Sequence, residues 1–113
     1  MSVSGIGPAA FSVTVEQAGD RTVVGARGEL DLATAPQLED ELMPPLAAGA
    51  AVALDLRGLE FMDSTGVRVI VAAHLAAQEH GGALVVCAVP DGPVARVLEI
   101  SGLDTVLDVV DAL

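Results

Sequence analysis

The sequence predicts an α/β fold with a mixed, mostly parallel sheet of four to five strands, an N-terminal antiparallel hairpin, and helices packed mainly on one face. Three observations lead to this prediction. Short apolar or alternating segments suit strands, longer segments with helical periodicity separate them, and Gly or Pro lies at most boundaries. Strands that alternate with helices form βαβ units, which imply right-handed crossovers and a mostly parallel sheet.

The length of 113 residues fits one domain, which buries about 65% of the surface that the unfolded chain exposes. We expect this domain to span residues 10–113. Residues 1–9 contain Gly and Pro without periodicity, which predicts a flexible N-terminus.

The N-terminal hairpin is predicted from alternation and turn residues. Residues 11–16 alternate apolar and polar side chains, as a half-exposed strand does, and residues 18–21 supply a turn. A second strand over residues 22–27 should pair back on the first.

The first helix is predicted from about residue 35 to 42. Thr34 and Gln37 have the spacing of a capping box, and Pro36 is tolerated in the first turn of a helix. Pro44 and Pro45 should end or break this helix, because proline lacks the backbone N–H group.

The sequence predicts a strand, a loop and a helix at the centre of the chain. Residues 52–56 form an apolar run typical of a buried parallel strand, residues 57–62 follow as a loop, and a helix runs from Asp63 to His80. Asp63 is placed to accept backbone N–H groups as an N-cap, and Ser64 falls on the first turn. There, the positive end of the helix dipole tolerates added negative charge.

The remaining segments complete the alternation. Gly81 and Gly82 stop the central helix, residues 83–88 are an apolar strand, and a turn at residues 90–93 precedes a short helix over residues 94–100. Residues 106–111 suit a short last strand with a helical turn.

A helical wheel of about 100° per residue divides the central helix into two sides. The side opposite Ser64 consists of small and branched residues that let a helix lie close to a sheet: Gly66, Val69, Ile70, Ala73 and Ala77. The side of Ser64 holds Arg68, Val71, Leu75 and Glu79. Two interpretations of Val71 and Leu75 stay open: a neighbouring helix covers them, or a partner protein buries them with Arg68 as a polar contact at the edge.

The charge excludes several classes of partner. The formal net charge is −11 and the chain has no lysine, so it would repel nucleic acid and anionic membranes and attract a basic protein surface.

No apolar run approaches the length of about 20 residues that spans a bilayer, and no basic segment precedes an apolar one at the N-terminus. A single cysteine, Cys87 in an apolar strand, reads as an inert thiol. We therefore expect a cytoplasmic protein.

Several enzymatic and carrier functions fit poorly. His74 and His80 are six residues apart, whereas a helical metal pair needs three or four, so we expect no metal site. Ser64 lacks the Gly-x-Ser-x-Gly elbow of a hydrolase. An acyl carrier also has Asp-Ser at a helix start, but carriers are all-helical. A receiver-type domain phosphorylated on Asp55 would need a lysine.

Two motifs together resemble the STAS-domain anti-sigma factor antagonists of bacteria. The motifs are residues 28–31, Gly-Glu-Leu-Asp, and residues 63–66, Asp-Ser-Thr-Gly, and the resemblance spans roughly residues 11–110. It implies a single STAS domain that is not an enzyme and holds no cofactor. The family's function is to bind an anti-sigma factor with serine kinase activity while unphosphorylated, which releases a sigma factor.

The resemblance also assigns roles to individual residues. It implies that the kinase phosphorylates Ser64 with ATP, that a phosphatase reverses this, and that Thr65 is a second candidate acceptor. It also implies that Asp31 contributes to recognition of the partner kinase, although Asp31 also suits an ordinary turn. The further candidates for recognition are residues of the motif and of the Ser64 side of the helix: Asp63, Thr65, Gly66, Arg68, Val71 and Leu75. The alternative is a STAS scaffold or a transporter-associated regulator without a serine switch.

Overall fold

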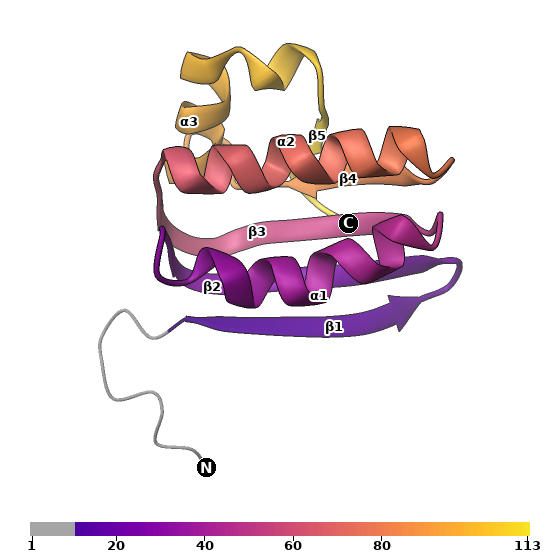
Figure 1. The fold of residues 1–113 in the computed structure, drawn as a ribbon. Helices are drawn as coiled ribbons and strands as arrows, with labels where there is room; N and C mark the ends of the chain where they lie inside the picture. The colour runs from indigo at the N-terminus through magenta and orange to yellow at the C-terminus, as the bar shows by residue number, and fades with distance from the viewer. Residues whose placement is uncertain (1–10) are drawn as a thin grey trace.

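The computed structural model describes residues 11–113, so the predicted flexibility of residues 1–9 lies outside the described part. One five-stranded sheet, in the order β1-β2-β3-β4-β5, carries the helices (Figure 1). In chain order the elements are β1 (Ser12–Ala18), β2 (Arg21–Leu30), α1 (Ala35–Ala47), β3 (Ala51–Met62), α2 (Ser64–Glu79), β4 (Ala83–Cys87), α3 (Pro93–Ser101), a 3-10 helix (Leu103–Thr105) and β5 (Asp108–Val110).

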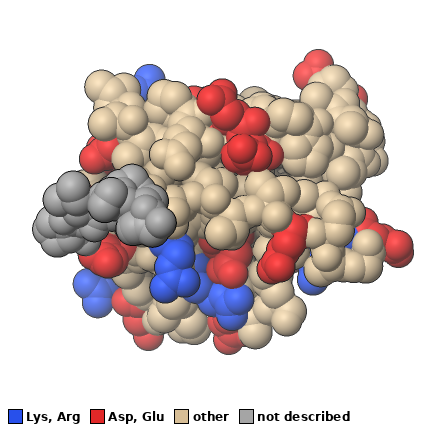
Figure 2. Space-filling view, turned by 90° about the horizontal axis from the view of Figure 1, so that it is seen from below, with Lys and Arg blue, Asp and Glu red and all other residues tan. Residues whose placement is uncertain are grey.

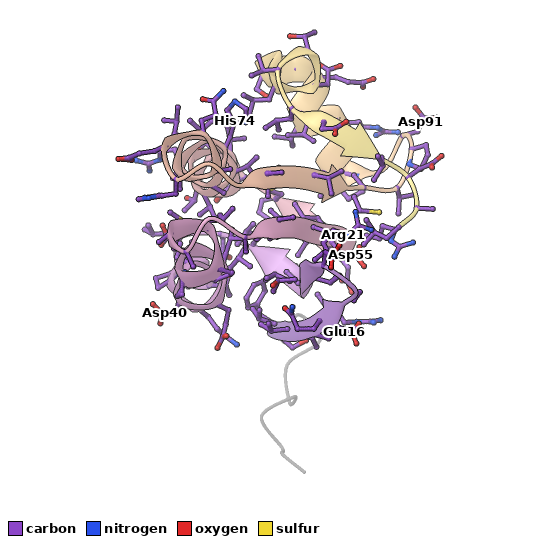
Figure 3. The ribbon with its side chains drawn as sticks, turned by 90° about the vertical axis from the view of Figure 1, so that its right-hand side faces the viewer. Glu16, Arg21, Asp40, Asp55, His74 and Asp91 are labelled. Carbon is purple, nitrogen blue, oxygen red and sulfur yellow. The ribbon has the colours of Figure 1, made fainter. Side chains whose placement is uncertain are left out.

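The sheet is mixed, as predicted. β1 pairs antiparallel with β2, and the other neighbouring strands pair parallel. Because each parallel strand lies beside the previous one in the same direction, right-handed crossovers place the connecting helices on one face. Figure 3 shows α1 and α2 on one side of the sheet, with Arg21 and Asp55 pointing to the other side.

An aliphatic core lies between the sheet and its helices. β2 is buried at alternate positions from Val24 to Leu30, because successive side chains of a strand point to opposite faces. In β3 the three consecutive residues 52–54 are all buried. The helices α1 and α2 each bury one stripe, and the largest side chains without exposure include Leu38, Leu54 and Ile70. Among residues 11–113, no helix is both long and apolar enough to cross a bilayer.

The first helix is longer than predicted. α1 continues past Pro44 and Pro45 to Ala47, whereas the sequence placed its end near residue 42. Leu42 and Leu46, one turn apart, are both fully buried, and this packing favours another helical turn despite the missing proline N–H groups. Gly49, with φ of 77°, then turns the chain toward β3.

The loop predicted over residues 57–62 is wrong. β3 runs on through Met62, and the end of β2 pairs with it as far as Leu30 instead of stopping at residue 27. Two register shifts in this pairing accommodate the irregular hydrophobic pattern and still direct Leu59 and Met62 into the core. Both strands therefore end close to Ser64.

Candidate functional site

The serine predicted as the functional residue opens α2. Asp63 has extended backbone angles, and its Oδ1 accepts the Thr65 N–H at 2.8 Å, so the predicted N-cap is confirmed. Ser64 is the first residue of the helix and its side chain is exposed. A hydroxyl at this place is accessible to a partner and lies in the positive potential of the helix start.

The start of α2 is fixed by contacts with β2 and β3. The Asp63 N–H donates to the carbonyl oxygen of Leu30 at 3.3 Å. Gly66 is buried against Met62 and Leu30: a Cβ atom at Gly66 would overlap the Met62 side chain and approach Leu30 Cδ2 to 3.0 Å. The position of Ser64 therefore depends on close packing at the ends of two strands.

Asp31 lies in the loop that follows Leu30 and is thereby close to the start of α2. Its Oδ1 accepts the backbone N–H groups of Ala33 at 3.0 Å and Thr34 at 3.2 Å. The turn interpretation of Asp31 is therefore confirmed. Asp31 is half-buried, and its hydrogen bonds within residues 11–113 all use Oδ1 and the backbone.

The predicted capping box at Thr34 and Gln37 is wrong. Thr34 precedes α1, but its side chain makes no bond to the helix's backbone N–H groups. The hydroxyl instead donates to the carbonyl oxygen of Glu29 at 2.8 Å and accepts the Asp31 N–H at 3.0 Å. The Thr34 hydroxyl therefore bonds to backbone groups three and five residues before it, at the end of β2 and in the following turn, instead of to its own helix.

The two sides of α2 are as the wheel predicts. All five residues assigned to the sheet side are buried: Gly66, Val69, Ile70, Ala73 and Ala77. On the side of Ser64, Arg68 and Glu79 are exposed, Leu75 is 57% exposed, and Val71 is half-buried. Residues 11–113 therefore leave Leu75 uncovered and cover Val71 only in part.

The structure exposes two apolar side chains, Phe61 and Leu32, that the sequence analysis did not assign to the site. Phe61, three residues before Ser64, is 46% exposed, and Leu32, in the loop after β2, is 74% exposed. Leu32 lines a hollow of about 280 Å³ between the first turns of α1 and α2, together with Thr65 and Arg68. For Leu32, the signal available in the sequence was an apolar residue within a polar turn.

The face of the sheet without α1 and α2 carries an ion pair. Arg57 Nε and Nη2 donate to the two carboxylate oxygens of Asp55 at 3.0 Å each. These hydrogen bonds hold the pKa of Asp55 below its usual value. Figure 2, which looks at the molecule from below, shows arginine side chains gathered on part of the surface with acidic ones between them.

Cys87 and the two histidines differ in their burial. Cys87 is fully buried in β4, as its apolar strand indicated, and burial raises the pKa of the thiol. His80 ends α2 as its exposed C-cap, while His74 is half-buried within the helix. Residues 11–113 contain no cluster of three or more side chains suited to a metal ion.

Comparison with known proteins agrees with this geometry. A family model described as "Mlab, STAS domain" matches residues 13–111. The anti-sigma-B factor antagonist of Bacillus subtilis (strain 168) is 31% identical over 99 residues, which cover 88% of this chain and 90% of that protein.

Solved structures give the same result. An anti-sigma factor antagonist from Mycobacterium paratuberculosis has a TM-score of 0.85 and 28% identity, covering 95% of this chain and 91% of its own. The phosphorylated form of the Bacillus cell fate determinant SpoIIAA has the same fold, with a TM-score of 0.64, 22% identity, and coverage of 88% and 91%. The chain belongs to the STAS-domain family.

Proposed function

We propose that this chain is an anti-sigma factor antagonist that acts by binding, not as an enzyme. Its unphosphorylated form binds an anti-sigma factor with serine kinase activity and so releases a sigma factor. Phosphorylation of Ser64 with ATP switches the binding off, and a serine phosphatase restores it. The observation that carries the proposal is the exposed Ser64 hydroxyl at the capped start of α2, in a chain whose relatives include anti-sigma factor antagonists.

The surface around Ser64 combines apolar and acidic groups. Leu32, which lines a hollow together with Thr65, and Phe61, three residues before Ser64, are exposed, and Leu75 is exposed further along α2. Asp31 and Asp63 add carboxylates at the ends of β2 and β3. An anti-sigma factor that fits this surface would bury the apolar side chains and bring basic groups to the carboxylates, which also agrees with the net charge of −11.

Ser64 is a better acceptor than Thr65. The Ser64 side chain is exposed, whereas Thr65 is half-buried and lines the hollow beside α1. A kinase reaches Ser64 without displacing Leu32 or α1. We therefore assign the phosphorylation to Ser64 and keep Arg68, Val71, Leu75 and Gly66 as further members of the recognition region.

The switch works through local charge. A phosphate adds about −1.5 to −2 charge, which a helix N-terminus favours by about 0.3–1 kcal/mol, so the free protein keeps its fold. In the complex, the same group would face a surface fitted to a neutral hydroxyl, close to Asp31 and Asp63. A cost of about 3–4 kcal/mol there weakens binding a few hundredfold.

The cellular setting follows from the same proposal. The chain works in the cytoplasm, where its kinase has ATP, and holds no cofactor of its own. It binds neither nucleic acid nor membrane, because both are anionic like this surface.

Phosphorylation with the cognate kinase and ATP tests the proposal. Wild type and Thr65→Ala should become labelled, and Ser64→Ala should not. Isothermal titration with the anti-sigma factor should show persistent binding of Ser64→Ala and binding weakened a few hundredfold for protein phosphorylated on Ser64. Labelling of Ser64→Ala together with loss in Thr65→Ala would move the acceptor to Thr65.

The same measurements decide the alternative function. A STAS scaffold or transporter-associated regulator has no serine switch. If neither Ser64 nor Thr65 is phosphorylated and no anti-sigma factor binds, this alternative replaces the proposed one.

A further inference from the structure

We infer that Thr34 is a positioning residue for Ser64, and this inference rests on the proposed function. Thr34 is in α1's N-cap position. Its hydroxyl bonds to Glu29 and Asp31, on either side of Leu30 at the end of β2, and the Leu30 carbonyl oxygen accepts the Asp63 N–H at the start of α2. The rate of Ser64 phosphorylation then depends on a side chain in a different βα unit.

The hydroxyl of Thr34 joins the two ends of a tight loop. It donates to the carbonyl oxygen of Glu29 at 2.8 Å and accepts the Asp31 N–H at 3.0 Å, while it lies 3.2 Å from Asp31 Oδ1. The Thr34 N–H also donates to the Asp31 carbonyl oxygen at 3.2 Å. Removing the hydroxyl leaves a backbone donor and a backbone acceptor without this partner.

Packing does little to fix this loop. Leu32 and Ala33, its two central residues, are exposed, and Leu32 reaches 74%. The conformation of the loop therefore depends on hydrogen bonds, and Thr34 makes those that connect it back to β2.

Leu30 transmits the position of this loop to α2. Its carbonyl oxygen accepts the Asp63 N–H at 3.3 Å, and its fully buried side chain lies against Gly66. Asp63 in turn caps the helix through Thr65. A shift at residues 29–31 therefore moves the residues on both sides of Ser64.

Phosphoryl transfer is sensitive to such shifts. The acceptor hydroxyl must be held in line with the phosphate, and a misplacement of about 1 Å reduces a rate up to about a hundredfold. We expect Thr34→Val, which keeps the shape and removes the hydroxyl, to lower kcat/KM for phosphorylation about tenfold. Thr34→Ser keeps the hydroxyl and should restore at least half of the wild-type rate.

The chain offers a matched control. Thr105 also donates its hydroxyl to a backbone carbonyl, that of Gly102, at 2.8 Å, but it lies in the 3-10 helix after α3. Thr105→Val removes the same kind of hydrogen bond away from the loop. It should change the phosphorylation rate less than twofold.

Two measurements test the inference, and the first needs no partner. In ¹H–¹⁵N spectra, Thr34→Val should shift the amide signals of Asp63 and Gly66, while Thr34→Ser and Thr105→Val should leave both close to their wild-type positions. Unchanged signals in Thr34→Val would overturn the coupling. This holds whether or not the protein binds an anti-sigma factor.

The second measurement is the rate of Ser64 phosphorylation by the cognate kinase in all four proteins. A tenfold loss in Thr34→Val with recovery in Thr34→Ser supports the positioning role. Equal rates for Thr34→Val and Thr105→Val would overturn it. A wild-type protein that is not phosphorylated at all refutes the proposed function instead, while the spectra still report on the coupling.

Discussion

The helices α1 and α2 begin in the same way in the sequence and differently in the structure. Each follows a parallel strand, and both start at the same edge of the sheet (Figure 1). The first residue of α1, Ala35, is buried, whereas the first residue of α2, Ser64, is exposed. At the third position the order is reversed: Gln37 is exposed and Gly66 is buried.

The capping side chains differ as well. Asp63 bonds within its own helix, and Thr34 bonds to the strand end and loop before its helix. A residue type that is common at the N-cap therefore does not by itself determine which backbone groups its side chain bonds to. The side chain of Asp63 caps α2 and leaves Ser64 exposed, while the side chain of Thr34 bonds to the segment before α1.

The largest expected effect is at the third helical position. Gly66→Ala should destabilise the protein by about 2 kcal/mol, because the new methyl group overlaps Met62 and overpacking exceeds the helix propensity that alanine adds. Urea unfolding followed by circular dichroism measures this change. A gain in stability would show that Met62 can move aside.

The cap of α2 should give an intermediate effect. Asp63→Ala removes the acceptor of the Thr65 N–H and should cost about 1 kcal/mol, while Asp63→Asn should keep most of the stability. Thermal unfolding of both variants measures the cap. The binding of Asp63→Asn to the anti-sigma factor separates capping from recognition: affinity equal to wild type would leave the carboxylate charge without a part in recognition.

The smallest effect is expected at the start of α1. Gln37→Ala should change the free energy of unfolding by less than about 0.5 kcal/mol, since Gln37 is exposed and α1 has no capping box. The same urea titration serves here, with Asp63→Ala as the positive control. A loss near 1 kcal/mol would restore the capping box in solution.

The order of strands and helices was predictable from periodicity. The hairpin, the alternation that follows and the buried side of α2 all agree with the sequence, because apolar residues recur with the period of the element that buries them. Element lengths were less predictable. α1 passes two prolines and β3 passes Gly58, since burial of Leu46 and Leu59 depends on neighbours far away in the chain.

The candidate site was predictable in part. The DSTG motif placed Ser64 and its cap, since an N-cap is local chemistry between adjacent residues. Leu32 and Phe61 were not found, because exposure depends on how two strand ends meet. The hydrogen bonds of Thr34 were not found, because the spacing of Thr34 and Gln37 does not record whether the hydroxyl bonds to the helix or to the preceding turn. Assignment of the kinase and the sigma factor rests on the proposed function.

Local sequence patterns account for the features with local causes: the apolar periods, the acidic charge, the glycine stops and the aspartate before α2. Which ends of the strands and helices meet depends on the folded chain. The Leu30 carbonyl, the Asp63 N–H and the Gly66 backbone come together because β2 and β3 pair with two register shifts and end at one edge. Contacts between residues more than thirty positions apart depend on that pairing, and no local pattern records it.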